Sequence, residues 1–392
     1  MKKIISILLC LFMLLTALSA CKKADDPVDE PPPTEEVDDD VVTPPPSDIP
    51  ADHDNCVYFC YVDAYNAFSP NEVMFTADGH DATWEQLFFS IFSSLNAMIE
   101  NYGEITDWSQ IEVEGQSYED SVKEYAVLNL LMFIGAEIEA ARVGITLGPE
   151  DYEDIQGQFE YLVENNGGEE AFMSILWYSD GIRSREMFDY LLGVSRLTNN
   201  LFAEMYGANG ELVTDEVAAA RADELGYLMA KHIIIETLEG DSSEAYATAE
   251  DILRQLNAYD GDDIGELFDQ LMAEHSEDPG IEMFPEGYLF KYTDMLEEFS
   301  SATEALEVGE ISGIVETEFG LHIIYRLPIN YDEFPMAFVN AEQYVTLRYA
   351  IASELFDDDM FKWSDLLDPA FTPAYNSISF DDLFNPCEYT PE

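Results

Sequence analysis

The sequence has little positive charge. It contains 16 Lys and Arg residues against 81 Asp and Glu residues, which gives a formal net charge of −65 at pH 7. Binding to nucleic acid or to anionic lipid headgroups depends on clusters of Lys and Arg, so the charge argues against both functions. Hydrophobic residues still make up 47% of the chain, so the acidity indicates the solvated surface of a folded protein.

Long apolar runs are also scarce. Beyond the N-terminus, the run closest to membrane-spanning length covers residues 126–136 and is too short to cross a bilayer. Two lysines followed by an apolar stretch over residues 2–15 are typical of a signal peptide. The tetrad Leu-Ser-Ala-Cys at residues 18–21 resembles the lipobox of bacterial lipoproteins. That resemblance implies that residues 1–20 are removed and that Cys21 carries lipid.

Cysteine is rare too, with five in the chain. Cys10 lies in the predicted signal peptide, and Cys21 is the predicted lipid site, so Cys56, Cys60 and Cys387 remain. Three thiols allow at most one intramolecular disulfide, and the sequence leaves the pairing open. They are too few for a zinc site, and no G-x-S-x-G, H-E-x-x-H or Walker-type motif occurs. We therefore expect no metal and no cofactor.

The composition and the hydrophobic periodicity divide the chain. Residues 21–55 are rich in Pro, Asp and Glu, which predicts an extended acidic linker. Residues 56–226 begin with a hairpin turn at Asp78-Gly79 and continue with helices, predicted to start near residues 83, 117, 149, 169, 184 and 214. After residue 329, one long helix is predicted over residues 338–366, followed by an acidic tail.

Residues 227–328 have a different pattern. Two β-branched runs, Lys231–Ile235 and Gly320–Arg326, each carry one histidine and predict two strands of one sheet. Two amphipathic helices with capping-box starts at Asp241 and Asp263 are predicted between them. A third predicted helix contains Met295 and Phe299.

This segment resembles the parvulin-type peptidyl-prolyl isomerases. The matching pieces, in chain order, are K-H-I-I-I at 231–235, S-x-D at 276–278, M-x-x-x-F-x-x-A at 295–302, G-E-I-S at 309–312 and F-G-x-H-I-I at 319–324. Several spaced motifs in the right order are more specific than any one of them. The resemblance implies a small antiparallel sheet surrounded by helices, and isomerisation of X–Pro bonds.

The same resemblance assigns the site. It implies that His232 and His322 form a hydrogen-bonded pair on adjacent strands and that Asp278 lies beside the reacting carbonyl. Thr317 would complete the network, and three residues would line the proline pocket: Leu289, Met295 and Phe299. Alone, either histidine is more often structural, the pocket residues are more often core, and Asp278 is equally suited to cap its loop. The joint occurrence of the two histidines favours the catalytic interpretation.

Some residues depart from the parvulin pattern. The loop 290–294 is short and lacks the usual glycines, and Phe319 stands where a small hydroxyl residue is common. Residues 236–239 are acidic where phosphate-directed parvulins are basic, which argues against recognition of phosphoserine-proline.

The order of the parts resembles that of PrsA-type and SurA-type foldases. This predicts an α+β chain in which a parvulin domain (227–328) is inserted in a helical chaperone domain (56–226), with 329–392 packing back on the helical part. The implied function is a lipid-anchored isomerase and chaperone on the outer face of the bacterial cytoplasmic membrane, acting on newly secreted proline-containing proteins. A homodimer is left open. One alternative is a holdase with an inactive parvulin domain; another is a scaffold for a surface partner, against which the paired histidines argue.

Overall fold

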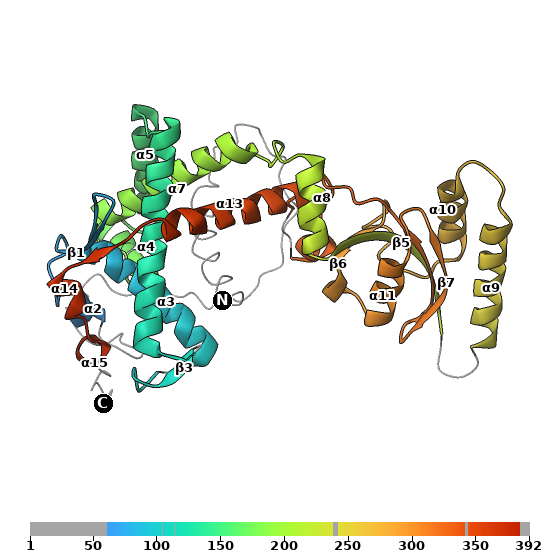
Figure 1. Cartoon of the computed structure of the whole chain (residues 1–392), viewed down its shortest axis with the longest axis horizontal. Coiled ribbons are helices and arrows are strands. Elements are labelled where there is room, and N and C mark those ends of the chain that lie inside the picture. The colour runs from blue at the N-terminus through green and yellow to red at the C-terminus, as the bar shows by residue number, and fades with distance from the viewer. Residues whose placement is uncertain (1–60, 104, 114, 238–241, 342–343, 385–392) are drawn as a thin grey trace. The chain divides into compact units, whose positions relative to one another are not determined.

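The computed structural model of the chain describes residues 61–103, 105–113, 115–237, 242–341 and 344–384 (Figure 1). The predicted signal peptide, the linker, all five cysteines and Asp241 lie outside these residues. Among the helices that are described, none has the length and apolarity needed to span a membrane. The contacts divide the chain into a helical unit, Met1–Leu201 with Asp358–Glu392, and a sheet unit, Phe202–Asp357.

The helical unit contains most of the predicted helices. Its elements are α2 (Tyr61–Tyr65), β1 (Val73–Ala77), β2 (His80–Thr83), α3 (Trp84–Tyr102), β3 (Ile111–Val113), β4 (Gln116–Ser117), α4 (Tyr118–Val143), α5 (Pro149–Asn165), α6 (Glu169–Asp180), most of α7 (Arg185–Tyr206), the end of α13 (Leu347–Asp365), β9 (Ala370–Phe371), α14 (Pro373–Asn376) and α15 (Phe380–Leu383). The predicted hairpin turn is confirmed, since Asp78 and Gly79 both have positive φ between β1 and β2.

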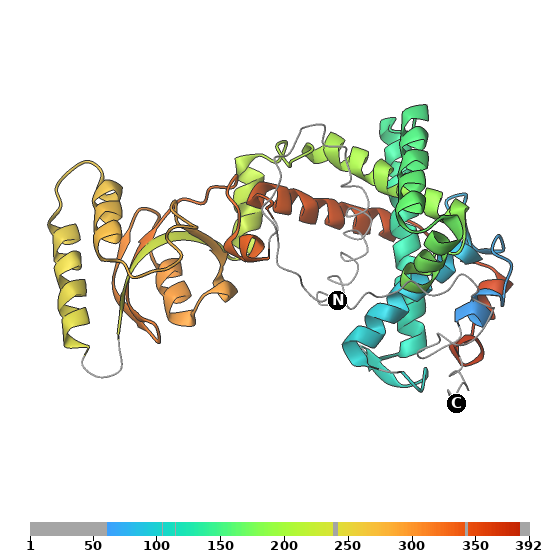
Figure 2. The same ribbon diagram turned by 180° about the vertical axis from the view of Figure 1, so that it is seen from behind.

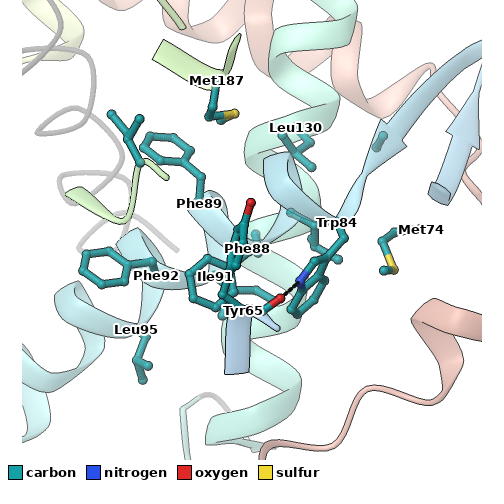
Figure 3. Close-up of a cluster of buried hydrophobic side chains, with 14 of the residues drawn as sticks. Tyr65, Met74, Trp84, Phe88, Phe89, Ile91, Phe92, Leu95, Leu130 and Met187 are labelled. Atoms are coloured by element: carbon teal, nitrogen blue, oxygen red, sulfur yellow. Dashed lines mark hydrogen bonds between the residues drawn. The ribbon is translucent and has the colours of Figure 1, made fainter. Parts of the chain in front are cut away.

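Aromatic side chains fill the core of the helical unit (Figure 3). Trp84 is fully buried at the start of α3, and its indole Nε1–H donates a 2.7 Å hydrogen bond to the Tyr65 carbonyl. Phe88, one turn further on, stacks on Trp177 with a centroid distance of 5.8 Å. Because the one polar group of this indole is paired, the ring is buried without an unsatisfied donor.

The C-terminal segment returns to the helical unit. Residues Ala370 and Phe371 form β9, which pairs antiparallel with β1, and Phe380 packs edge-on against Trp108 at 5.2 Å. The predicted single helix over residues 338–366 is wrong. The structure has a short α12 (Met336–Asn340) and a separate α13 that begins at Leu347. The first backbone N–H groups of α13 donate to carbonyls in the loop 331–333, which fixes its start there.

The sheet unit contains the predicted parvulin segment. Its elements are α8 (Asp215–Glu224), β5 (Tyr227–Glu236), α9 (Ser243–Ala258), α10 (Ile264–His275), β6 (Tyr288–Lys291), a 3₁₀ turn η2 (Tyr292–Asp294), α11 (Glu297–Ala305), β7 (Ile311–Thr317), β8 (Gly320–Arg326), α12 and the first part of α13. The four strands are antiparallel in the order β6-β5-β8-β7. The predicted α+β class with small antiparallel sheets is thereby confirmed.

Alternation along β5 and β8 gives the sheet two different faces. Ile233 and Ile323 point to one face, where they pack with α9 and α10. His232 and His322 occupy the other face, which α11 covers (Figures 1 and 2). Because side chains alternate with a period of two, both histidines come to the same face of neighbouring strands.

The sheet unit, Phe202–Asp357, extends beyond the predicted parvulin domain over residues 227–328 at both ends. A third cluster packs α8 and the start of α13 against one end of β5; its buried members are Val213, Ala218, Ala222, Tyr227, Met229, Leu289, Leu347, Ile351 and Ala352. Helix α8 and the start of α13 therefore share a core with strands β5 and β6.

Candidate active site

The two histidines lie next to each other. In the β5–β8 register, His232 is opposite Ile324 and His322 is opposite Ile234, so the two imidazoles are diagonal neighbours. Their Nδ1 atoms are 3.0 Å apart. Both rings are buried, with 9% and 5% of their surface exposed. At this depth, each ring nitrogen needs a hydrogen-bond partner.

Thr317 and Asp278 bind the outer nitrogens of the two histidines, so that four side chains form a hydrogen-bonded row: Thr317, His322, His232 and Asp278. On one side, Thr317 Oγ1 of β7 lies 2.8 Å from His322 Nε2. On the other, Asp278 Oδ2, in the loop after α10, lies 2.9 Å from His232 Nε2. The structure thus brings together the four residues to which the parvulin resemblance assigns catalytic roles.

The proton positions follow from the donor and acceptor inventory. An ionised Asp278 only accepts, so His232 carries a proton on Nε2, and in its neutral form it accepts through Nδ1. His322 then donates from Nδ1 and accepts the Thr317 hydroxyl proton at Nε2. When both imidazoles are neutral, every hydrogen bond of the row runs from Thr317 toward Asp278.

Burial and hydrogen bonding set the charges in this row. Burial would raise the pKa of Asp278, but hydrogen bonds from His232, the Tyr288 hydroxyl and the Gly280 N–H lower it to about 2. Burial, together with the neighbouring His232, lowers the pKa of His322 to about 4. At neutral pH the site therefore holds one carboxylate and a neutral His322.

Of the three predicted pocket residues, one contacts both histidines and a second packs in the same apolar cluster as the first. Phe299 packs edge-on against His232 at 5.2 Å and against His322 at 5.5 Å. Met295 is half-buried and belongs to the same apolar cluster. It precedes α11, which begins at Glu297, so the predicted helix starts later than the motif suggested.

The assignment of Leu289 to the proline pocket is wrong. In the β5–β6 pairing, Leu289 is opposite Met229, and both pack into the cluster with α8 and α13. Tyr288 is opposite Ala230, on the face that carries the histidines. A one-residue step along a strand changes the face, so the position beside the site belongs to Tyr288.

Tyr288 is the site residue that the sequence interpretation missed. Its hydroxyl donates a 2.7 Å hydrogen bond to Asp278 Oδ2, and its ring contacts His232 edge-on at 5.5 Å. Burial and the bond to Asp278 raise the pKa of this phenol, so it remains a donor. The sequence gives one indication of this role: in a strand over residues 288–290, Tyr288 and Phe290 lie on one face and Leu289 lies on the other.

Comparison with known proteins defines the class of this domain. Residues 232–327 match the family model of the rotamase, the PPIC-type PPIase domain, so the sheet unit contains a domain of the parvulin class. The foldase protein PrsA of Halalkalibacterium halodurans is 31% identical to this chain over 199 residues, which are 49% of this chain and 48% of the relative. The chain thus spans about half the length of the curated relative it matches.

Solved structures of similar proteins include PrsA from Bacillus cereus, with 17% identity, 80% of this chain and 99% of that chain covered, and a TM-score of 0.31. TbPIN1 is 23% identical over 26% of this chain and 98% of its own, with a TM-score of 0.23.

The depressed pKa of His322 predicts a pH-dependent stability. Unfolding returns this imidazole to its ordinary pKa of 6.5, so its contribution is complete above pH 6.5 and is lost as the pH falls toward about 4. The loss is on the order of 3 kcal/mol. We expect His322→Gln to make the sheet unit less sensitive to pH over this range, as measured by hydrogen exchange of β5 and β8 amides. His275→Gln, in the same unit but outside the row, is the control. Equal pH sensitivity of both variants and the unsubstituted chain would contradict the prediction.

Proposed function

We propose that this protein is a peptidyl-prolyl cis-trans isomerase and chaperone that assists the folding of newly secreted proteins. The proposal includes a lipid on Cys21 that holds the chain at the outer face of the bacterial cytoplasmic membrane. The observation that carries the isomerase assignment is the buried row from Thr317 through both histidines to Asp278 within a parvulin-class domain. The lipobox-like residues 18–21 and the acidic linker support the location.

The site suits rotation about an amide bond. The barrier of about 18–20 kcal/mol arises because resonance gives the C–N bond double-bond character and places negative charge on the carbonyl oxygen. Twisting the amide breaks the resonance and so reduces the negative charge on the carbonyl oxygen. A carboxylate at Asp278 beside the carbonyl therefore disfavours the planar amide more than the twisted one, which lowers the barrier.

The remaining residues position the carboxylate and the proline. The His232 Nε2–H fixes the Asp278 oxygen, and the second histidine with Thr317 fixes the tautomer of His232. Phe299 and Met295 offer an apolar surface for the proline ring, which removes water from the amide. This mechanism forms no covalent intermediate and transfers no proton to the substrate.

The chaperone activity belongs to the helical unit in this proposal. Its support is the order of a hairpin and helices before the parvulin domain, a return of the C-terminal segment after it, and the 31% identity to a protein named as a foldase. Unfolded, proline-containing chains are the clients proposed for both parts.

The isomerase assignment is tested with an Ala-Pro peptide in a protease-coupled or NMR-exchange assay. The unsubstituted chain is expected to accelerate isomerisation, and His232→Ala to lose most of that acceleration because Asp278 loses its buried donor. His275→Ala, with circular dichroism to check folding, is the matched control. No acceleration by the unsubstituted chain would overturn the isomerase assignment and leave a client-binding holdase built on a parvulin domain.

A further inference from the structure

The Asp278 carboxylate accepts three hydrogen bonds. Its Oδ1 accepts from the backbone N–H of Gly280 at 2.9 Å. Its Oδ2 accepts from His232 Nε2 at 2.9 Å and from the Tyr288 hydroxyl at 2.7 Å. The shortest of these bonds thus comes from a residue outside the row of Thr317 and the two histidines.

The Tyr288 ring is itself held in place. It is 7% exposed, and it contacts the rings of Phe284, at a centroid distance of 4.9 Å, and His232, at 5.5 Å. Its backbone is fixed by the pairing with Ala230 of β5. A buried ring packed against two other rings has few orientations, so its hydroxyl points at Asp278 before any substrate binds.

We infer that Tyr288 is a positioning residue of the isomerase site, whose hydroxyl holds the Asp278 carboxylate in one orientation and supplies a second proton donor to the oxygen that His232 binds. This inference rests on the proposed function. Tyr288 acts through Asp278, so its effect is read out in the protonation and orientation of that carboxylate.

The surroundings of Asp278 explain why a hydroxyl is needed. The titratable groups that face it are His232 from β5, Tyr288 from β6 and, one step further, His322 from β8. Within the described part of the chain, no Lys or Arg hydrogen-bonds Asp278, and the adjacent Glu277 carboxylate accepts instead from the Glu236 N–H. Within the described residues, hydrogen bonds from three donors, together with the charge interaction with His232, therefore stabilise this partly buried anion, and Tyr288 supplies one of the three bonds.

The test is Tyr288→Phe in the full-length chain, which keeps the ring and removes the hydroxyl. The pKa of Asp278, followed by ¹³C NMR of its carboxyl carbon, is expected to rise by about one pH unit or more. The part of the acid limb of kcat/KM that Asp278 sets is expected to move to higher pH by the same amount, while the part that His322 sets stays in place. Tyr246→Phe removes a hydroxyl of α9 that donates to Glu316 of β7 at 2.9 Å, away from the histidines, and it is expected to change neither quantity.

A double-substitution cycle separates positioning from packing. In the Asp278→Asn background, Tyr288→Phe is expected to have no further effect on the pH dependence, because the titrating carboxylate is absent. An equal effect of Tyr288→Phe in both backgrounds, or an unchanged Asp278 pKa in the single variant, would overturn the inference. The NMR titration does not depend on activity. An inactive protein with the expected titration would therefore refute the proposed function and leave the Tyr288–Asp278 link intact.

Discussion

Asp278→Asn is expected to lower kcat/KM for an Ala-Pro peptide by on the order of 100-fold, equivalent to about 2.7 kcal/mol of transition-state stabilisation. Asparagine keeps the size of the side chain, and its amide oxygen still accepts the His232 Nε2–H. The negative charge is lost, and with it the preference for the twisted amide. The variant is also expected to lose the part of the acid limb that Asp278 sets near pH 2, while the part that His322 sets near pH 4 remains.

The matched control is Asp269→Asn. Asp269 lies in the same unit and forms an exposed ion pair with Lys231 at 2.9 Å, so neutralising it changes the net charge equally without touching the site. Its activity is expected to stay within about twofold of the unsubstituted chain. Equal losses in the two variants would show that long-range charge, and not the position of Asp278, drives the effect. Full activity of Asp278→Asn would refute an electrostatic role for this carboxylate.

Much of the fold is encoded locally, and those parts were predictable. The β-branched runs around His232 and His322 predicted two strands, and the structure places them side by side in β5 and β8. Asp263 was predicted as a helix start, and its side chain accepts hydrogen bonds from the Gly265 and Glu266 N–H groups at the start of α10. Such signals lie within four residues of the feature that they specify.

The errors arise where distant parts of the chain decide the outcome. Strand β6 has four residues, too few for alternation to show which face is buried. The pairing with β5, about sixty residues earlier in the chain, determines which side chains of β6 point toward the histidines. This pairing places Tyr288 rather than Leu289 beside the site. The Tyr288–Asp278 bond spans a loop of irregular backbone, so no local periodicity indicates it.

The prediction of one helix over residues 338–366 was also wrong because contacts with distant parts of the chain decide the structure there. Its apolar residues continue at helical spacing across residues 341–346, but the loop 331–333 supplies acceptors for the Leu347 and Arg348 N–H groups. Arg348 also binds Asp332 at 2.7 Å and Asp215 at 2.8 Å, which fixes the start of α13 beside α8. Tertiary contacts therefore override the local helical preference here.

Gly320→Ala is expected to destabilise the sheet unit by roughly 3–5 kcal/mol. Gly320 begins β8 with φ of +147°, a conformation that side chains disfavour. A Cβ atom there would lie 2.3 Å from the Ile235 carbonyl oxygen and 3.0 Å from Glu236 Cα, both backbone atoms of the partner strand. Relief of this overlap requires β8 to move away from β5, which separates His322 from His232. Stability and isomerase activity are therefore expected to fall together.

Gly313→Ala provides the control for this prediction. Gly313 lies in β7 of the same sheet without a positive φ, and a Cβ atom there would meet no heavy atom within 4 Å. Its substitution is expected to change the stability by less than about 1 kcal/mol. Hydrogen exchange of the β5 and β8 amides measures both variants. Tryptophan fluorescence checks the helical unit, since all four tryptophans (84, 108, 177 and 363) lie there. If Gly320→Ala were as stable as Gly313→Ala, the close approach of β8 to β5 at this position would not be required, and the explanation of the glycine in the F-G-x-H-I-I motif would be wrong.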